Sequence, residues 1–350
     1  MTVTALGLPT VGQDTHGPAP ATGPLVDTFG RVATDLRVSL TDRCNLRCTY
    51  CMPAEGLDWL PGNALLSTAE LTRLLSIAVT RLGITSVRFT GGEPLVARHL
   101  EDVVAATAAL VPRPEITLTT NGIGLARRAA GLKAAGLDRI NVSLDTMNPA
   151  HFARITRRDR LTDVLDGLAA AKAAGLEPVK VNAVLDPVSG LDDAVELLRY
   201  CLTHGYQLRF IEQMPLDAGH SWQRGSVIDA DQILQTLQRH FELTPDPAPR
   251  GSAPAALWRV DGGPTVGIIA SVSHAFCAAC DRTRLTADGQ VRNCLFATEE
   301  SDLRALLRGG ADDAAIEAAW RAAMWAKKAG HGINNPDFVQ PARPMSAIGG

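Results

Sequence analysis

Six of the seven cysteines fall into two groups of three, and the spacing of each group suits iron. Cys44, Cys48 and Cys51, the first triplet, form a C-x3-C-x2-C motif. Four thiolates close a 4Fe-4S cluster, so three thiolates would leave one iron open to another ligand. The alternative is a structural zinc site, which usually pairs a C-x2-C motif with a distant second pair. The first triplet therefore predicts an iron–sulfur cluster with an open iron.

Cys277, Cys280 and Cys294, the second triplet, form a C-x2-C-x13-C motif near the other end of the chain. Three thiolates again predict a 4Fe-4S cluster with one open iron. The alternative here is a zinc site in which His274 is the fourth ligand. The remaining cysteine, Cys201, lies in an apolar helical stretch and is expected to be a buried thiol.

Two arginines follow the second triplet directly. Arg282 and Arg284 stand two positions apart in a strand-like run, so both side chains point to the same face. Guanidinium groups bind phosphate oxygens through two parallel hydrogen bonds. We therefore expect an anion site beside the second open iron, although a solvated surface strand would show the same spacing.

The residues between 35 and 212 alternate between short β-branched runs and longer helical stretches. A glycine follows several of the helical stretches, as at Gly83, Gly136, Gly175 and Gly205, where a left-handed cap is needed. This alternation predicts an α/β fold with a parallel sheet, an incomplete (β/α)6 TIM-like barrel, whose loops after the strands carry the functional groups. The expected strands are 36–40, 86–90, 116–119, 139–144, 179–185 and 208–211, and the expected helices are 68–82, 98–110, 125–135, 162–174 and 191–203.

Three parts of the chain differ in composition. Residues 1–24 are rich in Pro, Gly, Ala and Thr, so we expect a disordered tail, followed by the barrel at 25–215. Residues 216–350 should form a smaller C-terminal domain that carries the second cluster. Its expected elements are helices at 229–240, 301–308 and 312–328, strands at 265–270 and 282–286, and a Pro-rich linker at 245–249.

Composition also excludes some classes of protein. The formal net charge of −3 over 350 residues gives no footprint for nucleic acid. There is no run of 18 apolar residues, which argues against a membrane span, and the N-terminal residues do not resemble a secretory signal. We therefore expect a cytoplasmic protein, in which cysteines serve metals or catalysis more often than disulfides.

The segment from Cys44 to Pro53 resembles the cluster motif of the radical S-adenosylmethionine (SAM) superfamily, including the aromatic Tyr50 before the third cysteine. Thr90-Gly91-Gly92-Glu93-Pro94 is similar to the superfamily's GGE motif, which holds the methionine amino group. The resemblance implies that SAM binds the open iron and yields a 5′-deoxyadenosyl radical on reduction. It assigns SAM contacts to Tyr50, Gly92, Ser143 and Met214, of which the last two could equally be ordinary barrel positions.

The second triplet and its neighbouring residues indicate one family within this superfamily. The run from Cys277 to Leu285, followed by Cys294-Leu295-Phe296, is similar to the GTP 3′,8-cyclase family of molybdenum cofactor biosynthesis. Segments 180–182 and 209–212 and the ending 343–350 share this similarity, which extends from about residue 28 to the last residue. Asp281 departs from the family, which commonly has Asn there, and a carboxylate could weaken the attraction of phosphate locally.

The family resemblance implies an enzyme that converts GTP to (8S)-3′,8-cyclo-7,8-dihydroguanosine 5′-triphosphate. It implies that the tail enters the active site and that Gly349 and Gly350 assist hydrogen abstraction. Arg37, Arg88 and Lys180 are expected to point into the barrel. The alternative to a contact with GTP is that these cations pair internally with Asp145 or Glu212. The residues that the resemblance assigns to GTP are Arg37, Arg88, Thr119, Lys180, Arg282, Thr283 and Arg284, with Arg209 as a further candidate.

The same resemblance implies an electron donor such as flavodoxin or ferredoxin and product hand-off to cyclic pyranopterin monophosphate synthase. It implies no nucleic acid and no membrane partner, and it leaves a homodimer open. Two other functions remain: a radical SAM enzyme that modifies peptides with an auxiliary cluster, and a non-catalytic iron–sulfur electron carrier. A carrier would not need the GGE motif or a basic barrel interior.

Overall fold

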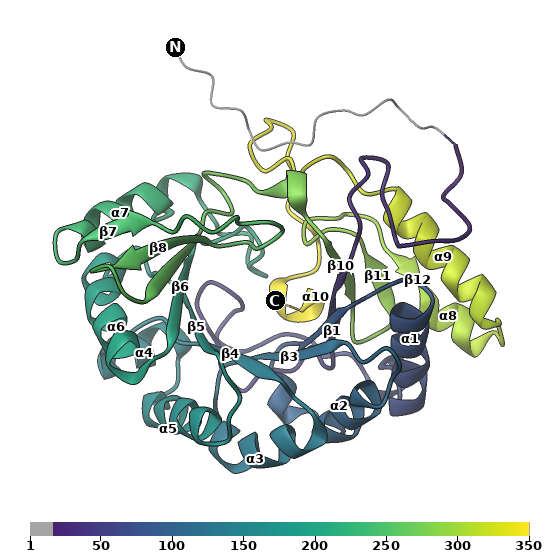
Figure 1. Cartoon of the computed structure of the whole chain (residues 1–350), viewed down its shortest axis with the longest axis horizontal. Coiled ribbons are helices and arrows are strands. Elements are labelled where there is room, and N and C mark those ends of the chain that lie inside the picture. Colours follow the sequence, from purple (N-terminus) through teal and green to yellow (C-terminus); the bar gives the residue numbers. More distant parts are fainter. Residues whose placement is uncertain (1–16, 350) are drawn as a thin grey trace.

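Six parallel strands curve into the wall of an open barrel, with helices on the outside (Figure 1). The computed structural model describes residues 17–349. Each strand pairs in parallel with the next along the chain, so the expected α/β partial barrel is confirmed. The strands are β1 (Asp35–Ser39), β2 (Ser86–Thr90), β3 (Glu115–Thr120), β4 (Arg139–Ser143), β5 (Val179–Val184) and β6 (Gln207–Ile211).

The strands alternate between residues that face the helices and residues that face the barrel interior. Leu36 and Val38 of β1 are fully buried in the hydrophobic core, whereas Asp35 and Arg37, which alternate with them, line a cavity. A strand sends successive side chains to opposite faces. The polar residues of the barrel strands therefore gather inside the barrel.

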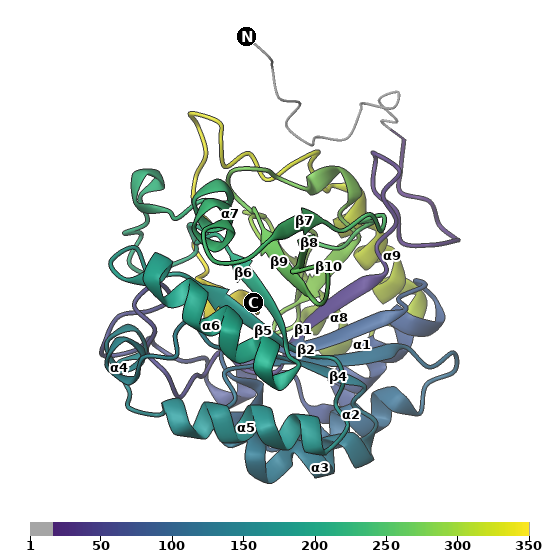
Figure 2. The same cartoon turned by 60° about the vertical axis from the view of Figure 1, so that its left-hand side comes forward.

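Helices cover the outer face of the sheet, as Figure 2 shows for α3, α5 and α6. Their ends follow local signals: Ser67 and Glu70 form a capping box at the start of α1, and Gly136 ends α3 in the left-handed conformation. A short helix after β4, α4, was not expected from the sequence. The helices are α1 (Thr68–Thr80), α2 (Leu100–Ala108), α3 (Leu125–Ala135), α4 (Pro149–Thr156), α5 (Leu161–Ala173) and α6 (Gly190–His204).

The C-terminal residues extend both edges of the barrel sheet. The strand β10 (Arg282–Leu285) pairs in parallel with β1, and β9 (Thr265–Ile269) pairs in parallel with β6. Within residues 17–349 the result is one sheet of twelve strands. The outer strands are β7 (Leu243–Pro245), β8 (Ala256–Val260), β11 (Gln290–Arg292) and β12 (Ser301–Asp302), and the helices are α7 (Ala230–Gln238), α8 (Leu303–Arg308), α9 (Asp313–Trp325) and α10 (Met345–Ile348).

The two ends of the described chain lie in different surroundings. Of the expected tail 1–24, residues 1–16 lie outside the described residues, and 17–24 contain no helix or strand. The carbonyls of Gly23 and Pro24 accept hydrogen bonds from Arg321 of α9. The C-terminal segment enters the barrel mouth, where α10 is seen in Figure 1. Gly350 lies outside the described part of the chain.

None of the helices in residues 17–349 combines the length and the apolar character that a membrane span requires.

Candidate active site

A cavity of about 780 Å³ opens at the barrel mouth, and both cysteine triplets line it. The first triplet follows β1, whereas Cys277 and Cys280 of the second triplet precede β10 and Cys294 follows β11. Because β10 pairs in parallel with β1, the two triplets lie toward opposite ends of these neighbouring strands, and the cavity extends between them. All six cysteines are partly buried free thiols, while Cys201 is fully buried in α6, as expected.

The loop of the first triplet is held by the end of α4. The Arg157 Nη1 donates to the carbonyls of Arg47 (2.8 Å) and Met52 (2.9 Å), on either side of Cys48 and Cys51. Arg157 adopts a positive φ of 56°, which turns the chain out of α4 toward this loop. Its guanidinium therefore fixes two points of the triplet loop.

The sulfur atoms of this triplet are buried and receive weak hydrogen bonds. The Leu46 backbone N lies 3.5 Å from the Cys44 Sγ, and the Asn121 Nδ2 lies 3.8 Å away. Burial raises the pKa of Cys44 to about 11 and that of Cys51 to about 12. Such thiols need a cationic ligand such as iron to become thiolates at neutral pH. Three sulfurs on one cavity, with N–H donors beside one of them, fit an iron–sulfur cluster with a free iron.

The GGE segment packs directly on the first-triplet loop. The Gly92 N donates to the Thr41 carbonyl (2.7 Å). A Cβ on Gly92 would lie 2.4 Å from the carbonyl oxygens of Asp42 and Arg43, which is far closer than atoms can approach. Glycine is therefore required here, and the backbone of the segment lies against the cluster loop at the cavity.

Three other residues that the sequence assigned to SAM also line the cavity: Tyr50, Ser143 and Met214. The Tyr50 hydroxyl donates to the Asp145 Oδ2 (2.8 Å), which joins the triplet loop to the end of β4. Burial raises the pKa of Asp145 to about 6. Ser143 is the last residue of β4, at the rim where strand ends meet.

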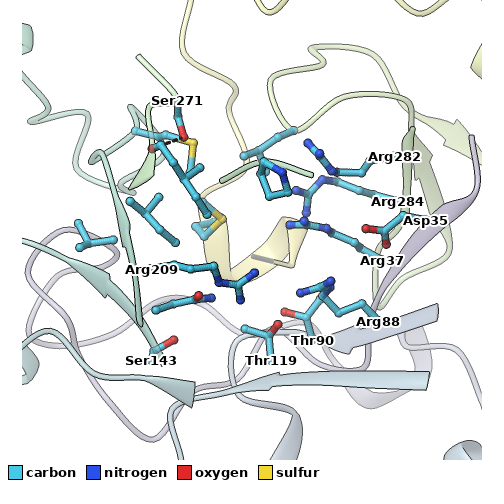
Figure 3. A pocket seen from close by; sticks show the side chains of 18 of the residues that line it. Asp35, Arg37, Arg88, Thr90, Thr119, Ser143, Arg209, Ser271, Arg282 and Arg284 are labelled. Atoms are coloured by element: carbon cyan, nitrogen blue, oxygen red, sulfur yellow. Dashed lines mark hydrogen bonds between the residues drawn. The ribbon is translucent and has the colours of Figure 1, made fainter. Parts of the chain in front are cut away.

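A row of three arginines crosses three adjacent strands. Arg37 of β1 lies directly opposite Arg284 of β10 on one side and Arg88 of β2 on the other, and all three point into the cavity (Figure 3). The Nε atoms of Arg37 and Arg88 are buried without a hydrogen-bond partner. Burial and the neighbouring Arg37 lower the pKa of Arg88 to about 9. Like charges placed opposite each other repel, so this row fits a polyanion.

The opposite wall carries further polar groups. The Arg209 Nη2 donates to the Asn141 Oδ1 (2.8 Å), and the Asn141 Nδ2 donates to the Thr119 Oγ1 (3.2 Å). Arg209, Thr119 and the arginine row surround the same space in Figure 3. Lys180 lines the cavity as well, and burial together with Arg209, Arg139 and Arg88 lowers its pKa to about 8.

The carboxylates proposed as internal partners of these cations are engaged elsewhere. Asp145 accepts from Tyr50 and from the Val184 backbone N (2.9 Å). Glu212 accepts from the backbone N atoms of Ala230 and Val272. Asp35, which the sequence reading missed, lies two residues from Arg37 on β1, opposite Arg282 and beside the arginine row. Burial alone would raise the pKa of Asp35, but Arg37, Arg88, Arg282 and Arg284 together lower it.

Strand alternation separates the residues of β10. Arg282 and Arg284 line the cavity, as their spacing predicted. Thr283 faces the other way, where its Oγ1 accepts from the buried Trp320 Nε1 (3.3 Å). The structure therefore does not bring the Thr283 side chain to the cavity. Asp281 also lines the cavity, and its Oδ1 lies 3.7 Å from the Arg282 Nε.

The segment 250–254, which follows the Pro-rich linker, lines part of the cavity, a role that the sequence reading missed. The guanidiniums of Arg250 and Arg282 lie 5.0 and 5.2 Å from the centroid of the Phe276 ring. The Arg282 Nη2 donates to the Ser252 carbonyl (2.7 Å), so the segment is tied to β10. A linker-like composition gave no signal for this role.

The second triplet has a different environment from the first. The Lys327 Nζ lies 3.3 Å from the Cys280 Sγ. Burial alone would raise the pKa of Cys280, but Lys327 and Arg282 lower it. His274, the proposed fourth zinc ligand, is exposed and is not among the cavity residues. Within residues 17–349, no group of three His, Cys, Asp or Glu is placed to hold a single metal ion.

The C-terminal segment closes one side of the cavity. Met345 and Ser346 of α10 line it, and the Gly349 carbonyl accepts a hydrogen bond from the Arg284 Nη1. A partial barrel with a C-x3-C-x2-C loop, an adjoining GGE segment and a basic interior defines the radical SAM class of enzymes. The sequence model of the Radical SAM superfamily matches residues 38–201, and that of Molybdenum Cofactor Synthesis C matches residues 206–333.

Curated relatives give the particular family. The chain is 82% identical to the GTP 3′,8-cyclase of Mycolicibacterium smegmatis and 79% identical to that of Mycobacterium sp. strain KMS. It is 72% identical to GTP 3′,8-cyclase 2 of Mycobacterium tuberculosis, and all three alignments cover 100% of both chains. The chain therefore belongs to the GTP 3′,8-cyclase family. Membership of the radical SAM class implies one 4Fe-4S cluster and SAM.

Solved structures share the fold. The structure of Streptococcus suis SuiB bound to S-adenosylmethionine has a TM-score of 0.55 at 13% identity, and covers 90% of this chain and 75% of SuiB. A second SuiB structure has a TM-score of 0.51 at 14% identity, and covers 75% of this chain and 60% of SuiB. At these identities the likeness concerns the fold alone.

Proposed function

We propose that the chain is a GTP 3′,8-cyclase that converts GTP to (8S)-3′,8-cyclo-7,8-dihydroguanosine 5′-triphosphate, the first step of molybdenum cofactor biosynthesis. One observation carries the proposal: the two cysteine triplets and the arginine row all line one cavity. A radical enzyme for a nucleoside triphosphate needs an initiating centre and a polyanion site within one enclosed space. The family of the chain supports the same reaction.

The first triplet would hold the SAM-binding cluster. When bound, the reduced cluster and SAM would supply a 5′-deoxyadenosyl radical to remove hydrogen from ribose C3′ of GTP, and formation of the C3′–C8 bond would then need one further electron and one proton to give the product. Gly92 brings its backbone close to the cluster loop, where it would hold the methionine part of SAM. Tyr50, Ser143 and Met214 would complete this binding site from the loop and the strand ends.

The second triplet would hold another 4Fe-4S cluster, whose open iron would face the purine of GTP. Cys277, Cys280 and Cys294 leave one coordination position free, and they lie beside the strand that carries Arg282 and Arg284. The purine and the phosphates would then meet neighbouring parts of one wall. The C-terminal segment and the segment 250–254 beside Phe276 would exclude water from the radical.

The arginine row would bind the triphosphate. Arg37, Arg88 and Arg284 lie at one level of the sheet, the Nε atoms of Arg37 and Arg88 have no hydrogen-bond partner, and Arg209, Lys180 and Thr119 face them. Guanidinium groups suit phosphate oxygens because they donate two parallel hydrogen bonds. Thr283 would contribute through its backbone at most, because its side chain faces Trp320.

Reduction of the clusters would require an outside electron donor, and a low-potential protein such as flavodoxin or ferredoxin is suited to that role. The cyclised triphosphate would pass to cyclic pyranopterin monophosphate synthase. Anaerobic incubation of the full chain, reconstituted with iron and sulfide, with SAM, dithionite and GTP tests the function. Mass spectrometry should detect a cyclised product isobaric with GTP, together with 5′-deoxyadenosine.

Two outcomes would contradict the proposal. Formation of 5′-deoxyadenosine without a GTP-derived product would leave the radical chemistry and remove GTP as the substrate, which favours a peptide-modifying enzyme. Absence of both products, from protein shown to hold two clusters, would favour an electron carrier. As a matched control, Arg88→Met should lose product when GTP is limiting while it still cleaves SAM.

A further inference from the structure

Lys327 lies just beyond α9 and is buried, with a relative exposure of 3%. Its Nζ contacts three acceptors: the Cys280 Sγ (3.3 Å), the Cys280 carbonyl (3.3 Å) and the Arg282 carbonyl (2.9 Å). An ammonium has three N–H donors, so these contacts account for all of them. The lysine therefore ties the middle cysteine of the second triplet to the start of β10.

The positive charge of Lys327 has different partners from those of neighbouring buried cations. Two nearby buried cations are paired with carboxylates, Arg31 with Asp27 (2.5 Å) and Arg321 with Glu317 (2.8 Å). Among the residues that the structure describes, no carboxylate forms an ion pair with Lys327. Its acceptors are two neutral carbonyls and one sulfur, so the sulfur is the one of these three acceptors that can carry negative charge as a cluster ligand.

We propose that Lys327 is a positioning residue of the second cluster, and that its ammonium raises the reduction potential of that cluster. The proposal rests on the second cluster of the proposed function. Reduction adds one negative charge to a cluster, and a cation in a low-dielectric site stabilises the more negative state. Hydrogen bonds to ligand sulfurs and local charge are the known means by which proteins set such potentials.

The contact with β10 gives the lysine a second effect. The Arg282 carbonyl that accepts from Lys327 belongs to the strand whose Arg282 and Arg284 side chains line the cavity. The same ammonium thus links the cluster ligand to the wall proposed to bind GTP. An easily reduced second cluster would be held at a fixed distance from the substrate.

The test uses the full chain with Cys44, Cys48 and Cys51 replaced by Ala, so that only the second cluster can form. Iron content and the electron paramagnetic resonance signal first establish that cluster, and a redox titration then gives its midpoint potential. In this background Lys327→Met should lower the potential by at least about 59 mV, which is a tenfold change for a one-electron couple. The matched control is Lys328→Met, which removes an exposed charge one residue away and should leave the potential unchanged.

Two further variants separate charge from hydrogen bonding. Lys327→Gln keeps N–H donors without the charge and should shift the potential in the same direction as Lys327→Met, whereas Lys327→Arg should stay near the parent. If Lys327→Met does not retain iron, the Gln and Arg variants decide. Equal potentials in Gln, Arg and parent proteins would overturn the proposal. A parent that holds no iron would instead overturn the second cluster itself, and this proposal with it.

Discussion

The Arg284 side chain donates a hydrogen bond from its Nη1 to the carbonyl of Gly349, across 65 positions of the chain. Arg284 belongs to the arginine row, and Gly349 follows the last helix, α10. The contact joins the proposed triphosphate site to the C-terminal segment. Binding of an anion to the arginine row would therefore affect the position of the C-terminal segment, and the position of that segment would affect the arginine row.

Gly349→Ala should abolish most product formation while leaving GTP binding within a few-fold of the parent. The residue has a φ of 88°, and a Cβ there would lie 2.9 Å from the Thr90 Cγ2 and 3.1 Å from the Ser39 Cβ. The tail must shift to relieve that crowding. We expect the turnover rate to fall at least about tenfold, or about 1.4 kcal/mol in the activation barrier.

The control for backbone strain is Gly262→Ala, whose φ is 71° but whose added Cβ would meet no atom within 4 Å. This variant should lose about 1 kcal/mol of stability and keep its turnover. Product mass spectrometry and equilibrium binding of GTP measure both variants. Normal turnover by Gly349→Ala would remove the tail from the reaction.

Gly92→Ala should prevent SAM binding because its Cβ would collide with two backbone oxygens that cannot move independently of the first-triplet loop. We expect weaker SAM binding by at least about tenfold and less iron in the first cluster. The comparison is Gly131→Ala in α3, where the added Cβ meets nothing within 4 Å and should stabilise the helix by about 0.5–1 kcal/mol. Wild-type SAM affinity in Gly92→Ala would contradict the assignment.

The barrel was predictable because local sequence patterns specify its strands and helices. Each strand alternates apolar and polar residues or precedes a helix with clear end signals, and β2 and α3 begin and end where the sequence predicted. The cysteine spacing likewise identified both triplets, which the sheet then brings together. Local periodicity decides these features, so no knowledge of long-range contacts is needed.

Other features depend on contacts that the sequence does not show. The pairing of β10 with β1 places Arg284 opposite Arg37, and the sequence around these two residues does not predict that pairing. Lys327 reaches Cys280 only after α9 has packed on the sheet. Thr283 is a different case, because its alternation with Arg282 and Arg284 already predicts that its side chain lies on the other face, where it contacts Trp320.

Arg157→Ala should loosen the first-triplet loop. The variant removes two hydrogen bonds, to the carbonyls of Arg47 and Met52, that hold the loop against α4. We expect affinity for the first cluster to fall by roughly tenfold, the size seen when partners of metal ligands are lost. Iron content and the cluster absorbance should be measured with the second-triplet cysteines replaced by Ala.

The neighbouring Arg158 gives the matched control because its side chain is exposed and donates only to the Arg157 carbonyl. Arg158→Ala should retain iron at the level of the parent. Equal loss in the two variants would mean that general disruption of the α4 end, and not the two carbonyl contacts, lowers cluster binding.

GTP binding should weaken as the pH rises through about 8. Burial, with Arg209, Arg139 and Arg88, lowers the pKa of Lys180 from 10.5 to about 8, so the lysine loses its charge in this range. A neutral amine attracts the triphosphate less, and one linked proton raises the dissociation constant by at most about tenfold per pH unit. The sign for stability is opposite. The folded chain binds fewer protons at Lys180 than the unfolded chain between pH 8 and 10.5, so this residue's contribution to stability rises with pH there.

Lys180→Arg isolates this effect because a guanidinium keeps its charge throughout the range. Its GTP dissociation constant should change less between pH 7 and pH 9 than that of the parent. The guanine base of GTP loses its own proton in the same way in both experiments. Any difference between the two curves is therefore due to residue 180. Binding is measured by calorimetry on protein without SAM, which separates affinity from turnover. Parallel curves would contradict the predicted pH dependence: Lys180 would either keep its charge throughout this range or lie too far from the triphosphate to affect its binding, and only the second case would remove it from the proposed anion site.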